Sequence, residues 1–85
     1  MEYVHFQVKA MPYNNLEIVL NRKANILLLN KINYHRYKTG KSYSTSMEFP
    51  DSGTRTINVP YKGEWHIVVE HGSFQGEIKA RLDVV

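Results

Sequence analysis

The stretch that decides the fold is Gly63–Gly72, GEWHIVVEHG, where one tryptophan, two histidines and two glutamates surround three aliphatic residues. Successive side chains of a β-strand point to opposite faces. Trp65, Ile67 and Val69 therefore share one face, and we assign them to the structural core. The opposite face carries the remaining side chains of the strand, namely Glu64, His66, Val68 and Glu70. We interpret the stretch as a core strand between two turns, not as a catalytic or metal-binding constellation.

The same period of two residues extends outward through most of the chain. Val4 and Val8 alternate with polar neighbours, and in the last segment Ile78 and Leu82 fall on the core face. The run Ile26–Leu29 is continuously apolar, which predicts a strand covered on both faces. Strands are predicted at residues 4–8, 16–20, 26–29, 43–47, 54–59, 64–71 and 77–84. Turns are predicted between them, at residues 11–15, 21–25, 49–53, 60–63 and 72–76.

One segment, NYHRYKTG at residues 33–40, has the features of a short helical turn. Asn33 can cap it, Tyr34 and Tyr37 lie three residues apart on one face, and Gly40 can take the left-handed position after its end. No segment could serve as the crossover helix of a parallel sheet. The sequence therefore predicts an all-β fold of one domain, residues 1–85. We expect a single small antiparallel β-sandwich of about seven to eight strands, either jelly-roll-like or a partly open barrel.

The composition excludes several kinds of site. The 85 residues include no cysteine, which removes disulfides, thiolate zinc sites and cysteine nucleophiles. The longest apolar run, Ile26–Leu29, is far shorter than the roughly 20 residues that span a membrane. The first ten residues lack a basic region followed by an apolar block. We therefore expect a soluble cytoplasmic protein without membrane contact.

The histidines and glutamates do not form an obvious catalytic set. His66 and His71 are five residues apart, so a strand would direct them to opposite faces. Glu64 and Glu70 would be about 20 Å apart along an extended strand, too far for a pair of glycosidase carboxylates. Two alternatives remain. One is a metal site built across strands from His5, His66 and Glu70, and the other is a hydrolase that uses a histidine with a neighbouring carboxylate. The leading expectation is no catalytic residue, no metal and no cofactor.

The middle of the chain is basic and aromatic. Between Ile18 and Met47 there is no acidic residue, although the segment carries six lysines and arginines. A mixture of cations and flat rings suits nucleotides and other anionic ligands. The candidate binding residues are Tyr34, Arg36, Lys38, Lys41 and Tyr43. The cations would bind an anionic group and a tyrosine would stack on the ligand. In the alternative interpretation, Tyr34 and Tyr37 anchor the helical turn and the cations are merely solvated.

Several motifs together resemble the small bacterial family called domain of unknown function 1883. They are ANILLL, NYHRYKTGKSY, INVPYKGEWHIVVEHG and GEIKARLDV, which cover nearly the whole chain. Glu70 departs from the family pattern, in which aspartate is commoner, and Ser73 replaces a usual second glycine. The resemblance implies a compact β-sandwich domain, found alone or joined to Toll/interleukin-receptor (TIR) domains. It implies no catalytic residues.

From these observations we expect a non-enzymatic recognition or interaction module, serving as the sensing or assembly part of a TIR-associated defence or signalling system. The alternative is a domain that binds a small ligand, either a nucleotide or a sugar. The expected partner is a protein or a small anion, whereas nucleic acid is not favoured. A homodimer formed through the exposed edges of the sheet is a further expectation.

Overall fold

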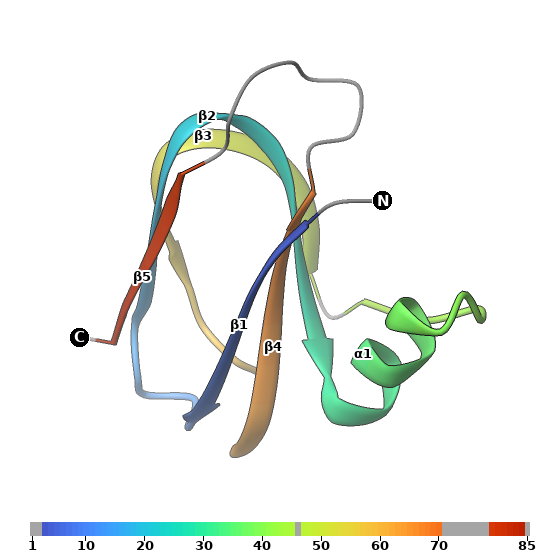
Figure 1. The fold of residues 1–85 in the computed structure, drawn as a ribbon. Helices are drawn as coiled ribbons and strands as arrows, with labels where there is room; N and C mark the ends of the chain where they lie inside the picture. Colours follow the sequence, from blue (N-terminus) through green and yellow to red (C-terminus); the bar gives the residue numbers. More distant parts are fainter. Residues whose placement is uncertain (1–2, 46, 71–78, 85) are drawn as a thin grey trace.

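The structure, a computed structural model, describes residues 3–45, 47–70 and 79–84 (Figure 1). These ranges contain one antiparallel sheet and one helix. In chain order the elements are β1 (Tyr3–Ala10), β2 (Leu16–Asn30), α1 (Lys31–Lys38), β3 (Met47–Ile57), β4 (Gly63–Glu70) and β5 (Ala80–Val84). The all-β prediction with one short helix is thus confirmed. None of the helices in these ranges is long and apolar enough to cross a membrane.

Strand β2 is the centre of the sheet. β3 pairs with both halves of β2, so it occupies one edge of that strand along its length. The other edge of β2 pairs first with β5, through residues 16–20, and then with β4, through residues 25–30. β1 adds outside β4. Figure 1 shows β2 and β3 arching together, so that β5 lies in one layer and β4 and β1 lie in the facing layer.

The predicted turns at residues 21–25 and 49–53 are wrong, because the chain continues through both places as strand. The pairing register of β2 and β3 shifts between Leu20 and Ala24, as in a β-bulge. Ala24 is buried, and Gly53 of β3 has φ +79°, which only glycine adopts without strain. Polar residues and a glycine therefore mark a bend, not a chain reversal.

This bend also explains the strand count. The predicted strands at 16–20 and 26–29 merge into β2, and those at 43–47 and 54–59 correspond to one strand, β3, that begins only at Met47. The seven or eight predicted strands are therefore not confirmed, since the described ranges contain five. Each merged strand is long enough to belong to both layers.

The main core lies between the two layers. It gathers inward-facing side chains of β2 from both sides of the bend, for example Ile18 and Ile26. Trp65, Ile67 and Val69 of β4 lie in the same cluster, and half-buried Leu82 of β5 packs against it. The Trp65 indole is fully buried, and its Nε1–H donates a hydrogen bond to the Tyr61 carbonyl oxygen at 2.9 Å. Ile78, the fifth predicted core residue, lies outside the described residues.

A second, smaller core lies on the outer face of the sheet, beneath α1. It consists of Leu27, Leu29 and Val68, against which the tyrosines of α1, Tyr34 and Tyr37, pack. Residues 26–29 are buried on both faces, as their apolar run predicts. Helix α1 has eight residues, too few for stability in isolation, so these contacts hold it in place.

The two ends of α1 are fixed by hydrogen bonds. The N-cap is Asn30, whose Oδ1 accepts from the Asn33 backbone N–H at 2.9 Å, so the predicted cap at Asn33 is wrong by three residues. At the other end Gly40 has φ +77°, as predicted. The Gly40 N–H donates to the Tyr37 carbonyl, and the Lys41 N–H donates to the Arg36 carbonyl, which is a Schellman motif. This motif folds Lys41 back beside Arg36.

Candidate functional site

Two hollows lie beside the exposed side of α1, and Lys31 and His35 line both of them. The first, here called the basic hollow, has a volume of about 540 Å³. The described residues that line it are Lys31, Ile32, His35, Arg36, Lys41 and Ser42. The second, here called the imidazole hollow, has a volume of about 480 Å³ and lies between α1 and the outer face of β1 and β4.

The basic hollow carries positive charge, and none of the described residues that line it has a carboxylate. Arg36 and Lys41 are exposed, and within the described part of the chain neither forms an ion pair. The Schellman motif at the end of α1 holds their backbones together. Ile32 is 66% exposed at the same place, so an apolar side chain adjoins the cations. Such a surface can bind an anionic group that is attached to an apolar body.

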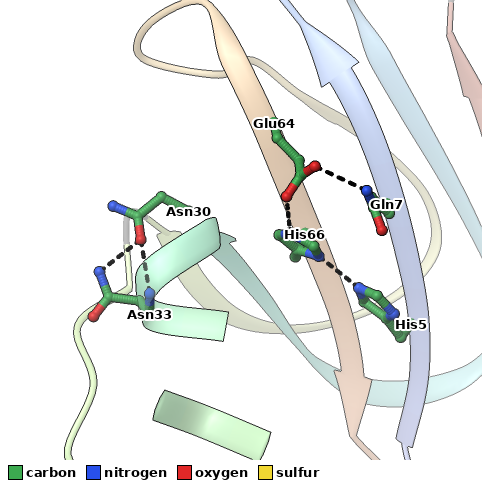
Figure 2. Close-up of polar contacts among 6 residues, drawn as sticks. All are labelled: His5, Gln7, Asn30, Asn33, Glu64 and His66. Atoms are coloured by element: carbon green, nitrogen blue, oxygen red, sulfur yellow. Dashed lines mark hydrogen bonds and ion pairs between the residues drawn. The ribbon is translucent and has the colours of Figure 1, made fainter. Parts of the chain in front are cut away.

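The imidazole hollow has a floor of hydrogen-bonded polar side chains (Figure 2). His5 Nε2 lies 2.7 Å from His66 Nδ1, and His66 Nε2 lies 3.0 Å from Glu64 Oε2. Gln7 Nε2 donates to the other Glu64 oxygen at 2.9 Å. Antiparallel pairing explains the arrangement: Gln7 is opposite His66, so His5 reaches His66 diagonally across β1 and β4.

The proton positions in this network follow from its partners. Ionised Glu64 can only accept, so His66 Nε2 carries a proton. When His66 carries only this proton, it accepts at Nδ1, and the donor is the Nε2–H of His5. Both nitrogens of His66 are thereby used, and His66 is only 4% exposed. The one imidazole nitrogen of the pair that is left to take a proton is His5 Nδ1.

Tyr34 covers the two imidazoles. Its ring lies 4.1 Å and 8° from His5, and 4.4 Å and 7° from His66. The two imidazoles are nearly parallel, with centroids 5.0 Å apart. With a hydrogen bond between their nitrogens, this separation places them edge to edge in one plane, not one above the other. Lys38 Nζ lies over the Tyr34 ring, 5.5 Å from its centre.

Burial and neighbouring charges set the protonation of these groups. Desolvation lowers the pKa of His5, and the nearby His66 and Lys38 lower it further. The hydrogen bond from His66 is the main cause that lowers the pKa of Glu64. Burial, followed by the hydrogen bond with Tyr3, raises the pKa of Tyr34 to about 12. At neutral pH the network therefore consists of ionised Glu64, neutral His5 and neutral Tyr34.

We expect the domain to lose stability in acid through this network. Because the folded pKa of His5 lies below its ordinary value of 6.5, the stability that neutral His5 contributes is present above pH 6.5 and is lost as the pH falls through the folded value. Glu64, with its pKa below 4.5, adds a second loss at lower pH. Urea midpoints at successive pH values should fall less steeply below pH 6.5 in His5→Gln than in the unmodified chain. An unchanged profile in His5→Gln, or the same flattening in the exposed-histidine control His35→Gln, would contradict this.

The predicted binding residues do not form a single site. Arg36 and Lys41 meet in the basic hollow, whereas Tyr34 is packed on the imidazoles beneath Lys38. Tyr43 packs edge-on against the Tyr37 ring, with centroids 5.2 Å apart. It lines a third hollow of about 360 Å³, together with Tyr3, Tyr37, Lys38, Gly40 and Lys41.

The across-strand set considered for a metal is also divided. His5 and His66 do meet, but their carboxylate is Glu64. Glu70 instead accepts a 2.6 Å hydrogen bond from the Tyr37 hydroxyl and a second one from Asn25. Among residues 3–45, 47–70 and 79–84, no three histidine or acidic side chains are arranged to hold a metal ion. His71 lies outside the described residues.

Comparisons with known proteins give one match. Comparison with curated proteins and with solved structures found no similar protein. Residues 1–85 match a single protein family, whose description is "Domain of unknown function (DUF1883)". The match covers the whole chain, including the strand Gly63–Glu70 and helix α1 that build the two hollows. The chain therefore belongs to the DUF1883 family.

Proposed function

We propose that this domain is a non-enzymatic recognition module that binds an anionic group of a small ligand or protein partner in the basic hollow. The observation that carries the proposal is the pairing of Arg36 and Lys41 at the end of α1, in a hollow with no carboxylate among its described lining residues. The planar guanidinium of Arg36 suits two parallel hydrogen bonds to a phosphate or carboxylate. Lys31 and Lys41 add positive charge on either side.

The surroundings of these cations favour a ligand with more than a bare anion. Exposed Ile32 offers an apolar contact, and the Ser42 hydroxyl can donate or accept a hydrogen bond. In the third hollow, Tyr43 is exposed next to Lys41 and can stack on a base or ring. A nucleotide combines these properties, so a nucleotide is the favoured small ligand and a neutral sugar is the weaker alternative.

The proposal extends to the biological setting of the domain. The family resemblance implies bacterial domains that occur alone or joined to TIR domains. We accordingly propose a cytoplasmic module that serves as the sensing or assembly part of a TIR-associated system, with the basic hollow as its contact. Family membership supports this setting by association.

The test is a charge reversal in the basic hollow. Arg36→Glu with Lys41→Glu removes two charge-assisted hydrogen bonds, each worth about 1.5–3 kcal/mol, so we expect affinity to fall about 100-fold or more. The matched control is Lys62→Glu with Lys79→Glu, which makes the same change in net charge with exposed lysines that do not line the hollow. Binding of ATP, ADP-ribose, inorganic phosphate and glucose would be measured by calorimetry, and binding of a co-expressed TIR protein by co-purification.

The control variant separates specific binding from general attraction to a positive protein. Equal losses in both double variants would show that only net charge matters. Unchanged binding in the Arg36 and Lys41 variant would remove the basic hollow from the proposal. Both double variants should keep the melting temperature of the unmodified chain, because all four side chains are exposed.

A further inference from the structure

We propose that the imidazole hollow is a second oxyanion site, and that an anion bound there is accompanied by one proton, which His5 carries. The ligand class is a sulfate or phosphate group. The inference rests on the proposed function, since it deepens anion recognition by this domain. The basic segment around α1 cannot form this site by itself, because the floor of the hollow comes from β1 and β4.

The position of the proton follows from the hydrogen bonds on the floor. Glu64 is bound to His66 and Gln7, and both nitrogens of His66 are bound as well. Among the described residues, His5 Nδ1 has no hydrogen-bond partner, whereas His5 Nε2 has one. Among the described side chains no buried nitrogen or oxygen lacks a hydrogen bond, so His5 Nδ1 is not sealed off and can meet a ligand. A proton at Nδ1 gives the imidazole a second N–H, which an anion can accept.

The imidazole pair can hold one added proton but not two. With one proton on His5 Nδ1, the His5–His66 and His66–Glu64 hydrogen bonds stay intact. A second proton would set two N–H groups against each other across the 2.7 Å contact between the rings. The chain of bonds from Glu64 also stabilises the single charge, because a carboxylate that accepts from one imidazole makes the next one a better proton acceptor.

The charges that face His5 come from every element around it. β4 contributes His66 and Glu64, and β1 contributes Tyr3 and Gln7. α1 contributes Tyr34 and Lys38 directly above the imidazoles, with Lys31 and His35 in the lining. While the imidazoles are neutral, the positive charges of Lys31 and Lys38 and the negative charge of Glu64 give the hollow a net charge of +1. One added proton raises the net charge of the hollow to +2, and this charge attracts an oxyanion.

The coupling gives the direction of the pH effect. In the free domain, burial, His66 and Lys38 hold the pKa of His5 below 6.5, so His5 is mostly neutral at pH 7. A bound oxyanion stabilises the protonated form and raises the pKa. Affinity for the anion should therefore increase as the pH falls from 7, by up to about tenfold per pH unit between the free and bound pKa values of His5.

The test uses sulfate and the full chain, because sulfate stays doubly charged between pH 5 and pH 8 and contributes no titration of its own. Ring signals of the histidines, followed by NMR, give the pKa of His5 with and without saturating sulfate. We expect sulfate to raise that pKa by about one unit and to bind up to about fivefold more tightly at pH 5.5 than at pH 7. In His5→Gln, whose amide can still donate to His66, the pH dependence should vanish. In His35→Gln it should remain.

Two outcomes would overturn the inference. If sulfate shifts the signals of Arg36 and Lys41 but leaves the pKa of His5 unchanged, only the basic hollow binds anions and the proposed function stands alone. If the pH dependence disappears in His35→Gln, the proton belongs to His35. An increase of the His5 pKa that survives Arg36→Glu with Lys41→Glu would support this site even if the basic hollow fails its own test. Should His5→Gln not fold, the NMR titration of the unmodified chain decides.

Discussion

Replacing Trp65 with alanine should lower the free energy of unfolding by about 3–5 kcal/mol. The indole is fully buried at the centre of the core between the two layers. Removal of the indole leaves a cavity that the surrounding strands cannot close. It also leaves the Tyr61 carbonyl oxygen without its hydrogen-bond donor. A domain of this length has a total stability of roughly 4–13 kcal/mol, so the variant should lose a large share of it and melt at a clearly lower temperature.

The measurement is urea unfolding followed by far-ultraviolet circular dichroism, since the variant lacks the fluorescent indole. Trp65→Phe retains most of the packing and should lose about 1–3 kcal/mol, the cost of a smaller ring and an unpaired carbonyl. Tyr13→Ala is the control, because Tyr13 is 76% exposed and should change stability by less than about 0.5 kcal/mol. A loss in Trp65→Ala no larger than in Tyr13→Ala would refute the placement of Trp65 in the core.

Replacing Tyr37 with alanine should detach α1 from the sheet and cost about 3 kcal/mol. The Tyr37 ring packs against the outer core of Leu27, Leu29 and Val68, and its hydroxyl donates to Glu70 at 2.6 Å. An eight-residue helix has little stability without such contacts. Hydrogen exchange should show loss of amide protection throughout Lys31–Lys38, while β2 and β4 stay protected.

Tyr37→Phe separates the hydroxyl from the ring. It should cost about 1.5–3 kcal/mol at neutral pH, as expected for a hydrogen bond to a charged group. Burial, followed by the bond to Glu70, raises the pKa of Tyr37 above its ordinary value of 10.0. The stability from this hydroxyl is therefore present below about pH 10 and is lost as the pH rises toward the folded value.

This pH window provides the control for the Tyr37 prediction. Unfolding midpoints measured from pH 8 to pH 11 should decline more steeply in the unmodified chain than in Tyr37→Phe. Tyr13→Phe, which changes an exposed tyrosine in the same way, should decline as the unmodified chain does. If Tyr37→Phe keeps the steeper decline, the hydroxyl does not contribute through Glu70.

Much of the fold was accessible from the two-residue period of the sequence. Burial of one face of GEWHIVVE and of both faces of Ile26–Leu29 follows from which side chains are apolar. The bend of β2 at residues 21–24 was not accessible. Asn21, Arg22 and Lys23 are exposed whether the chain reverses there or bulges, so the same polar residues fit both structures. Only the pairing of β3 along both halves of β2 distinguishes a bend from a turn.

The candidate site shows the same limit. Arg36 and Lys41 were predicted as binding residues from the absence of acids around them, and they line one hollow. The contact between His5 and His66 depends on the register of two strands about sixty residues apart in the chain. A shift of that register by one residue would move His5 to the opposite face. Local patterns carry no information on such a register: the alternative metal set considered from the sequence contained Glu70, whereas the carboxylate that meets the two histidines is Glu64.

The long-range pairing of β1 has a consequence for biosynthesis. Residues 3–10 leave the ribosome before the other strands of this sheet, yet their only partner strand within the described chain is β4, at residues 63–70. β1 must therefore stay unpaired and partly apolar until β4 has been translated. Proteins dominated by such distant pairings fold slowly, and while they fold they expose unpaired strand edges that are prone to aggregation. We infer that this sheet reaches its native pairing only after β4 has left the ribosome, and that β1 needs protection from aggregation until then.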